Sequence, residues 1–235
     1  MKFFLFLLLN FLFLSCASNQ SSVTEWTNKR PKIYLDENGE KISSNTFQER
    51  WRNNKNGLVR WDYGSQDSGR VAKLQKPLYS RHFVTYPLFA HKIEEITGRT
   101  FPPTTIFLLE FTFLNDLCSD YSTNEWNKTQ IKFRKNFLTP QKEELEKRNE
   151  NLVILNFFED GISLLNSPDS PEEYFYIDKD NFLRNNFFKT QTLCGSMALI
   201  KPNGQALVRN GEYSTGEFEQ HLKPENWDLF FSPEE

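Results

Sequence analysis

The stretch TTIFLLEFTFL, residues 104–114, decides the fold of this chain. Apolar residues occupy both phases of its two-residue repeat, and β-branched and aromatic side chains are frequent. That pattern is typical of a central strand that is covered on both faces. The stretch LVILNFF, residues 152–158, has the same character. Two buried strands of this kind predict an α/β fold.

Helical sequence separates the two strands and follows the second one. Residues 125–149 predict a helix in two pieces, because Thr139 and Pro140 supply an N-cap and a first-turn proline for the second piece. Residues 181–188 can form a short helix. Strand, long helix, strand and short helix therefore follow one another along the chain.

A hairpin and a last helix close this part of the chain. Residues 197–200 and 205–209 are expected to pair across a turn at residues 201–204. Ser214, with Glu217 three residues later, predicts the capped start of a helix. The complete order is strand, helix, strand, helix, hairpin, helix.

That order and two short segments resemble the thioredoxin family. LIKPNGQ, residues 199–205, is similar to the hairpin of that family, and GEY, residues 211–213, resembles the start of its closing segment. The resemblance covers residues 99–224 and implies a thioredoxin-like three-layer α/β/α sandwich. Residues 31–98 are expected to form an irregular α+β N-terminal extension, and residues 225–235 a C-terminal tail.

Within the extension, residues 32–42 predict a short strand, an acidic turn and a second short strand. Asn45 is expected to cap an amphipathic helix. Glycines and a proline then punctuate residues 53–81, which predicts irregular structure. Residues 86–96 predict a helix that Gly98 ends.

The resemblance also gives Cys118 a position. In the thioredoxin family the reactive cysteine follows the first central strand, at the N-terminus of a helix that lowers the thiol pKa. The second cysteine of the family would fall at Tyr121 and its cis-proline at Ser196, so the usual dithiol exchange is not possible here. Asp116, just before Cys118, is expected to cap the following helix.

Cys118 and Cys194 are the candidate site residues. The chain has three cysteines, and if Cys16 carries a lipid, these two remain as a pair that the resemblance brings together. A structural disulfide between them would stabilise the fold by roughly 4 kcal/mol. Alternatively, they form a catalytic redox pair that exchanges disulfides, or they stay as two buried thiols.

The N-terminus has the features of a secretory signal peptide, residues 1–15. Lys2 precedes a twelve-residue apolar run that Asn10 alone interrupts. As a helix the run would span about 18 Å, against a hydrocarbon core of about 30 Å, which favours a cleaved signal over a membrane span.

The end of the signal, FLSC at residues 13–16, resembles the lipobox of bacterial lipoproteins. This predicts that Cys16 is the lipid-bearing first residue of the mature chain and that residues 16–30 form a lipidated flexible tether. The alternative is ordinary cleavage after Ala17. Labelling with a palmitate analogue, repeated with Cys16→Ala, separates the two.

Composition excludes several classes of function. From Cys16 onward the chain carries 27 basic and 31 acidic residues, and this mild acidity argues against a nucleic-acid partner. The sequence holds no glycine-rich phosphate loop, Gly-x-Ser-x-Gly elbow or metal-ligand spacing. No cofactor and no metal are therefore expected.

The sequence thus predicts a lipoprotein of the bacterial cell envelope, anchored to the membrane through lipid at Cys16 and facing the periplasm. Its degenerate thioredoxin-like domain is expected to be a non-catalytic binding or structural module, with an envelope protein as a partner. The alternative is an enzyme, a thiol-disulfide oxidoreductase that uses the non-adjacent pair Cys118 and Cys194.

Overall fold

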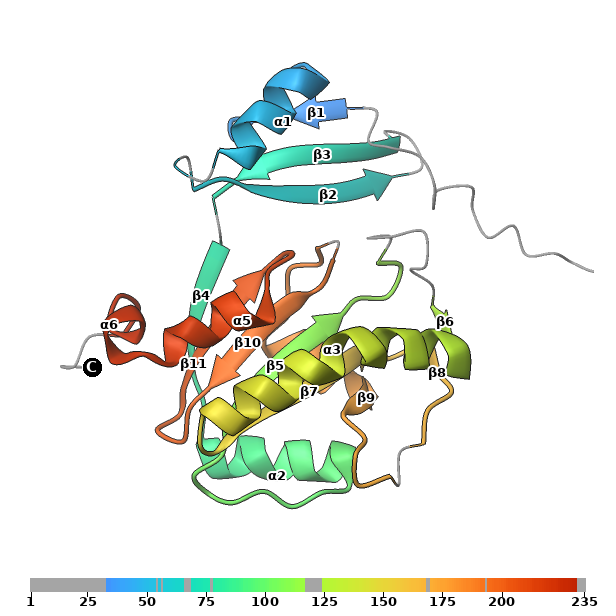
Figure 1. Cartoon of the computed structure of the whole chain (residues 1–235), viewed down its shortest axis with the longest axis vertical. Coiled ribbons are helices and arrows are strands. Elements are labelled where there is room, and N and C mark those ends of the chain that lie inside the picture. The colour runs from blue at the N-terminus through green and yellow to red at the C-terminus, as the bar shows by residue number, and fades with distance from the viewer. Residues whose placement is uncertain are drawn as a thin grey trace, which may run out of the picture.

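The computed structural model describes residues 33–53, 55, 57–65, 69–76, 78–116, 124–167, 170–192 and 194–231. The predicted signal peptide and tether lie outside these ranges, as do Cys16 and Cys118. The described chain forms a small unit with a three-stranded sheet and a large unit built on a six-stranded sheet (Figure 1).

The large sheet contains the two strands that the sequence predicts. Its six strands are β4 (Leu78–Phe83), β5 (Ile106–Thr112), β7 (Leu152–Glu159), β9 (Phe175–Asp178), β10 (Ser196–Ile200) and β11 (Gln205–Asn210). They lie in the order β4-β11-β10-β5-β7-β9. β5, β7 and β9 are parallel, whereas β10 and β11 form an antiparallel hairpin beside β5. The expected hairpin is thereby confirmed.

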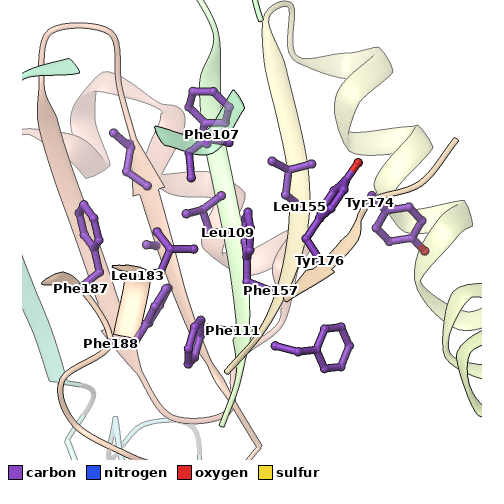
Figure 2. Close-up of a cluster of buried hydrophobic side chains, with 14 of the residues drawn as sticks. Phe107, Leu109, Phe111, Leu155, Phe157, Tyr174, Tyr176, Leu183, Phe187 and Phe188 are labelled. Atoms are coloured by element: carbon purple, nitrogen blue, oxygen red, sulfur yellow. The ribbon is translucent and has the colours of Figure 1, made fainter. Parts of the chain in front are cut away.

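One face of this sheet is covered by α2 (Tyr86–Thr97) and α4 (Phe182–Asn186). Phe107 and Phe111 of β5 point to this face (Figure 2). Phe89 of α2 packs edge-on against Phe107, with 5.6 Å between ring centroids. The helix expected before Gly98 is confirmed, and its apolar side completes this layer of the core.

The other face is covered by α3 (Lys128–Arg148), as Figure 1 shows. Leu145 of α3 packs there in one cluster with Leu108 and Ile154 of the sheet. Since residues alternate between the two faces along a strand, β5 serves both layers. The strand order and the two helical layers make a thioredoxin-like three-layer α/β/α sandwich.

α3 is one continuous helix, and the expectation of two pieces is wrong. Asn127 and Gln130 form a capping box at its start, and Pro140 lies inside it. A proline removes one hydrogen bond, here to the carbonyl of Asn136. Both Pro140 and Asn136 are exposed, so water can bind the freed carbonyl and the helix continues.

The small unit is regular, which corrects the irregular structure expected for residues 53–81. Its elements are β1 (Ile33–Leu35), α1 (Ser44–Arg52), β2 (Val59–Ser65) and β3 (Gly69–Gln75). The sheet order is β1-β3-β2, and Phe47, Ala72 and Leu74 form the core. Gly69 pairs with Ser65 at the strand ends, so the glycines do not interrupt the strands.

The acidic turn after β1 is confirmed. The Asp36 carboxylate accepts the backbone N–H groups of Asn38 and Glu40, both at 2.9 Å. α1 begins after Ser43, which accepts the N–H of Thr46 at 3.1 Å. The N-cap is therefore Ser43 and not Asn45.

The large unit extends beyond residues 99–224 at both ends. β4 and α2, which were assigned to the extension, belong to its sheet and core. The predicted C-terminal tail, residues 225–235, includes most of α6 (Pro224–Trp227) and is packed against the domain. Within it, Trp227 stacks on Phe231 with 4.7 Å between ring centroids. Both rings are buried against the α3 side of the sheet, because that face has apolar area left to cover.

Short elements complete the structure: β6 (Glu125–Trp126), β8 (Ser163–Leu164), η2 (Lys179–Asn181), α5 (Thr215–Phe218) and η3 (Glu219–Leu222). β6 and β8 form a separate two-stranded sheet. α5 is the helix expected after Ser214. Ser214 is its N-cap residue, but the Ser214 side chain makes no hydrogen bond to the first turn of the helix. Together with η3 it covers the sheet beside α3.

Candidate functional site

Two loops of the large unit meet at one end of the sheet, one leaving β5 and one entering β10. The Asp116 carboxylate accepts the backbone N–H groups of Cys194 at 2.9 Å and Gly195 at 3.0 Å. The contact confirms that these loops approach each other. It also corrects the expected role of Asp116, since α3 begins further along the chain and is capped by Asn127 instead.

The second loop has an unusual backbone. Cys194 and Gly195 both have positive φ values, 68° and 76°. Residues other than glycine rarely adopt this region of backbone conformation. A Cβ atom at Gly195 would lie 2.6 Å from the carbonyl oxygen of Phe111. Only glycine allows β5 to approach so closely, and the two Asp116 hydrogen bonds hold the loop in this conformation.

Cys194 takes part in a disulfide. The other two cysteines, Cys16 and Cys118, both lie outside the described residues, so the structure gives no geometry for the predicted pair. Ser196, at the predicted cis-proline position, opens β10 and accepts the N–H of Gly211 at 3.3 Å. None of the peptide bonds in the described ranges is cis.

A cavity of about 1010 Å³ lies beside this junction, and Cys194 forms part of its wall. α3 lines it on the side facing the sheet, and Trp51 and Arg60 reach it from the small unit. Aromatic residues supply much of the lining, namely Trp51, Trp126, Phe133, Phe137 and Tyr213. The volume is at the upper end of the range of about 300–1,000 Å³ for small-molecule sites.

Three adjacent strands form the floor of the cavity. In the sheet register, Met197 of β10 lies between Glu110 of β5 and Arg209 of β11. Paired residues point to the same face, and all three line the cavity. Two strand spacings separate Glu110 from Arg209, which is about 10 Å. The Arg209 guanidinium donates instead to the carbonyl oxygens of Gly211 and Glu212, and Glu110 accepts a hydrogen bond from Thr215.

Glu110 is a carboxyl group in a largely apolar setting. The Thr215 hydroxyl donates a hydrogen bond to Glu110 Oε1. Burial raises the pKa of Glu110, and the Thr215 hydrogen bond and the charge of Arg134 oppose that shift without cancelling it. No cation of the described residues lies within ion-pair distance of this carboxyl.

We expect Glu110→Gln to stabilise the protein in a pH-dependent way. The unfolded chain releases the Glu110 proton near pH 4.5 and the folded chain only at higher pH. Between these values the folded state binds more protons, so wild-type stability falls as pH rises, whereas the neutral amide escapes this loss. Urea unfolding from pH 4 upward should show equal stabilities at the lowest pH and a growing advantage for the variant above it. Parallel curves would contradict this, and exposed Glu172→Gln is the control.

Arg209 shapes the cavity wall. Its fully buried side chain donates from Nη1 to the carbonyl oxygens of Gly211 at 2.9 Å and Glu212 at 2.8 Å. The Tyr213 ring stacks on the guanidinium, with 3.7 Å from Cζ to the centroid. The Nε and Nη2 atoms of Arg209 are buried and have no hydrogen-bond acceptor among the described residues. Arg209 therefore holds the loop 211–213 and is closed to ligands.

Sequence reasoning missed the cavity and both charged residues of its floor. Glu110 is the only charged residue in the stretch 104–114, and Arg209 follows the apolar run ALV. A charge within a strand that is otherwise apolar on both phases is a signal for a buried polar site. Trp51 and Arg60 do have a signal, since basic and aromatic residues alternate in RWR, residues 50–52, and RWDYG, residues 60–64, as they can on a binding surface. That these residues line a cavity of the large unit depends on how the two units pack.

Comparisons with known proteins add two solved structures. DsbF from MTB, in its mixed oxidized and reduced forms, is 15% identical; the match covers 51% of this chain and 79% of that one, with a TM-score of 0.30. A thioredoxin candidate from Neisseria meningitidis is 15% identical, covering 76% of this chain and 93% of that one, with a TM-score of 0.32. No protein-family model matches, and no curated protein matches either.

Within the described ranges, no three His, Cys, Asp or Glu side chains gather closely enough to hold a metal ion. None of the helices in those ranges combines the length and the hydropathy that a bilayer crossing requires.

Proposed function

We propose that this chain is a membrane-anchored lipoprotein of the bacterial envelope whose thioredoxin-like domain binds a ligand and does not catalyse a reaction. The single observation that carries the binding role is the cavity of about 1010 Å³ with its aromatic lining and half-buried Glu110. Small-molecule pockets are ordinarily lined by apolar residues with a few polar groups, as this cavity is.

The arrangement around Cys194 favours a structural disulfide over a reactive one. Both oxygens of Asp116 are occupied by the amides of Cys194 and Gly195, so this carboxylate is not positioned as a base. The bond that we propose between Cys194 and Cys118 would tie the two loops together beside the cavity. Its role would be to fix the wall that the ligand contacts.

The anchor belongs to the same proposal. A lipid at Cys16 would attach the chain to the membrane, and the polar residues 17–22 would let the domain face the periplasm at some distance from the bilayer. An envelope protein is the partner that such a location makes available. The palmitate labelling of wild type and Cys16→Ala tests the anchor.

The binding role is tested with N-phenyl-1-naphthylamine, a neutral dye that fluoresces in apolar sites. We expect saturable one-to-one binding by the folded protein. Thr112 follows Glu110 on the same face of β5 and lines the cavity, so the larger side chain of Thr112→Trp should weaken binding by about tenfold or more as it fills the space.

The matched control is Thr100→Trp, which adds the same indole at an exposed position outside the cavity. It should leave the affinity unchanged. The proposal fails if the wild type shows no saturable binding, or if Thr112→Trp binds the dye as well as the wild type does.

A second candidate function is thiol-disulfide exchange by Cys118 and Cys194. It is favoured by the position of Cys194, which is partly exposed and lines the cavity. A substrate thiolate would attack one sulfur of the bridge, forming a mixed disulfide and releasing the other cysteine as a thiol. A second substrate thiol would then attack the substrate sulfur of the mixed disulfide and release the first cysteine, which leaves the substrate oxidised to a disulfide and the cysteine pair reduced. A midpoint potential above about −300 mV, with mixed disulfides trapped by a single Cys→Ser variant, would support this candidate.

A further inference from the structure

We propose that the cavity is selective for a cationic ligand, an organic amine or ammonium group on an apolar body, with its positive charge at the Glu110 carboxylate. This inference rests on the proposed binding function and names the chemical class of the ligand. It is carried by the unpaired carboxyl on the cavity floor, by the aromatic walls and by the other charges around the cavity.

The carboxyl of Glu110 has room for a partner. Its only hydrogen bond among the described residues comes from the Thr215 hydroxyl to Oε1. Oε2 therefore remains for a ligand, and the residue lines the cavity directly. A carboxylate in an apolar setting is stabilised by a cation brought next to it, because the low local dielectric strengthens their attraction.

The walls suit a cation with an apolar body. Phe133 and Phe137 project from α3 and are 70% and 69% exposed, although both line the cavity. Trp51 and Trp126 line other parts of the wall. Aromatic faces attract ammonium groups through the ring quadrupole and also cover the apolar part of such ligands.

Two of the three described arginines that line the cavity are engaged by other groups of the protein. Arg60 is held by Asp62 in two hydrogen bonds of 2.7 Å, and Arg209 is closed beneath Tyr213. Arg134 also lines the cavity. It is exposed on α3, with its guanidinium 6.0 Å from the Phe137 ring, and its charge opposes the rise in the pKa of Glu110.

The mouth of the cavity has further negative charge. Glu212 and Glu217 are both exposed and both line the cavity. These two carboxylates add negative charge to the cavity beside Glu110, against one exposed positive charge among the described lining residues, Arg134 on α3.

The test uses three naphthalene probes of similar size in competition with N-phenyl-1-naphthylamine. They are 1-naphthylmethylamine, which is a cation at neutral pH, 1-naphthalenemethanol, which is neutral, and 1-naphthoate, which is an anion. We expect the wild type to bind the amine about tenfold tighter than the alcohol, the size of effect that a charged hydrogen bond gives. The naphthoate should bind most weakly.

Glu110→Gln keeps the shape of the side chain and removes its charge. The variant should lose the preference for the amine while its affinity for the alcohol changes less than about twofold. Glu172→Gln, at an exposed position outside the cavity, is the matched control and should keep the preference. Because Glu110→Gln is expected to be at least as stable as wild type, loss of the preference cannot be ascribed to unfolding, which thermal melts of both proteins check.

Equal affinity of the wild type for amine and alcohol overturns the inference, as does tighter binding of the naphthoate. So does a preference that survives Glu110→Gln or disappears with Glu172→Gln. These results differ from failure of the proposed function, in which N-phenyl-1-naphthylamine itself does not bind.

Discussion

We expect Cys194→Ser to lower the free energy of unfolding by about 4 kcal/mol under oxidising conditions. If Cys194 is bonded to Cys118, the bridge closes a loop of about 76 residues, and removing a bridge of that span restores a large chain entropy to the unfolded state. For a chain of this size the loss corresponds to a fall in melting temperature of roughly 8–16 °C. Urea or thermal unfolding measures it.

The pairing is checked by a double-mutant cycle. Cys118→Ser alone should cost as much as Cys194→Ser, and the double variant should cost no more than either single one. Cys16→Ser is the control and should unfold like the wild type. Additive losses in the double variant would mean that Cys118 and Cys194 do not share a bond.

The same variants separate the two candidate functions. If the disulfide is structural, reductant at physiological strength should leave wild-type stability intact, because such bridges have midpoint potentials below about −300 mV. An exchange-competent bridge would open under those conditions, and the wild type would then unfold like Cys194→Ser.

The large sheet could be predicted because its strands are buried on both faces. Burial of that kind leaves a local pattern, continuous apolar sequence in residues 104–114 and 152–158, that does not depend on the neighbours. The sequence did not predict β2, because the small unit has little apolar core and β2 carries the charged residues Arg60 and Asp62. These two side chains bind each other and are only 21% and 10% exposed. Whether the helix continues through Pro140 depends on the access of water to the carbonyl of Asn136. That access is known only once the packing of the helix is known.

The candidate site could be predicted only in part. Cys194 and the meeting of the two loops followed from the resemblance to the thioredoxin family, which places the loop after the first central strand beside the loop that enters the hairpin. The cavity floor depends on the strand register, which pairs Met197 with both Glu110 and Arg209. No local sequence motif predicts that register. The role of Asp116 could not be predicted, because its hydrogen-bond partners lie 78 and 79 positions away.

The loop junction leads to the second large effect, an expected loss of about 3 kcal/mol on Asp116→Ala. The substitution removes two hydrogen bonds to a charged acceptor, each worth about 1.5–3 kcal/mol, although relaxation of the loop recovers part of that sum. It also leaves the amides of Cys194 and Gly195 without their partner in a partly buried place. Urea unfolding at neutral pH measures the loss.

Asp116→Asn should lose about half as much, because the amide keeps one oxygen acceptor and replaces the other with a donor that the two N–H groups cannot use. Asp160→Ala is the control: the Asp160 carboxylate also accepts a backbone amide, from Gly161 at 2.9 Å, but it is exposed, and the expected loss is below about 0.5 kcal/mol. If Asp116→Ala cost no more than Asp160→Ala, the disulfide and Gly195 alone would hold the loop. A larger cost means that the carboxylate fixes the left-handed conformation of Cys194 and, through it, the wall of the cavity.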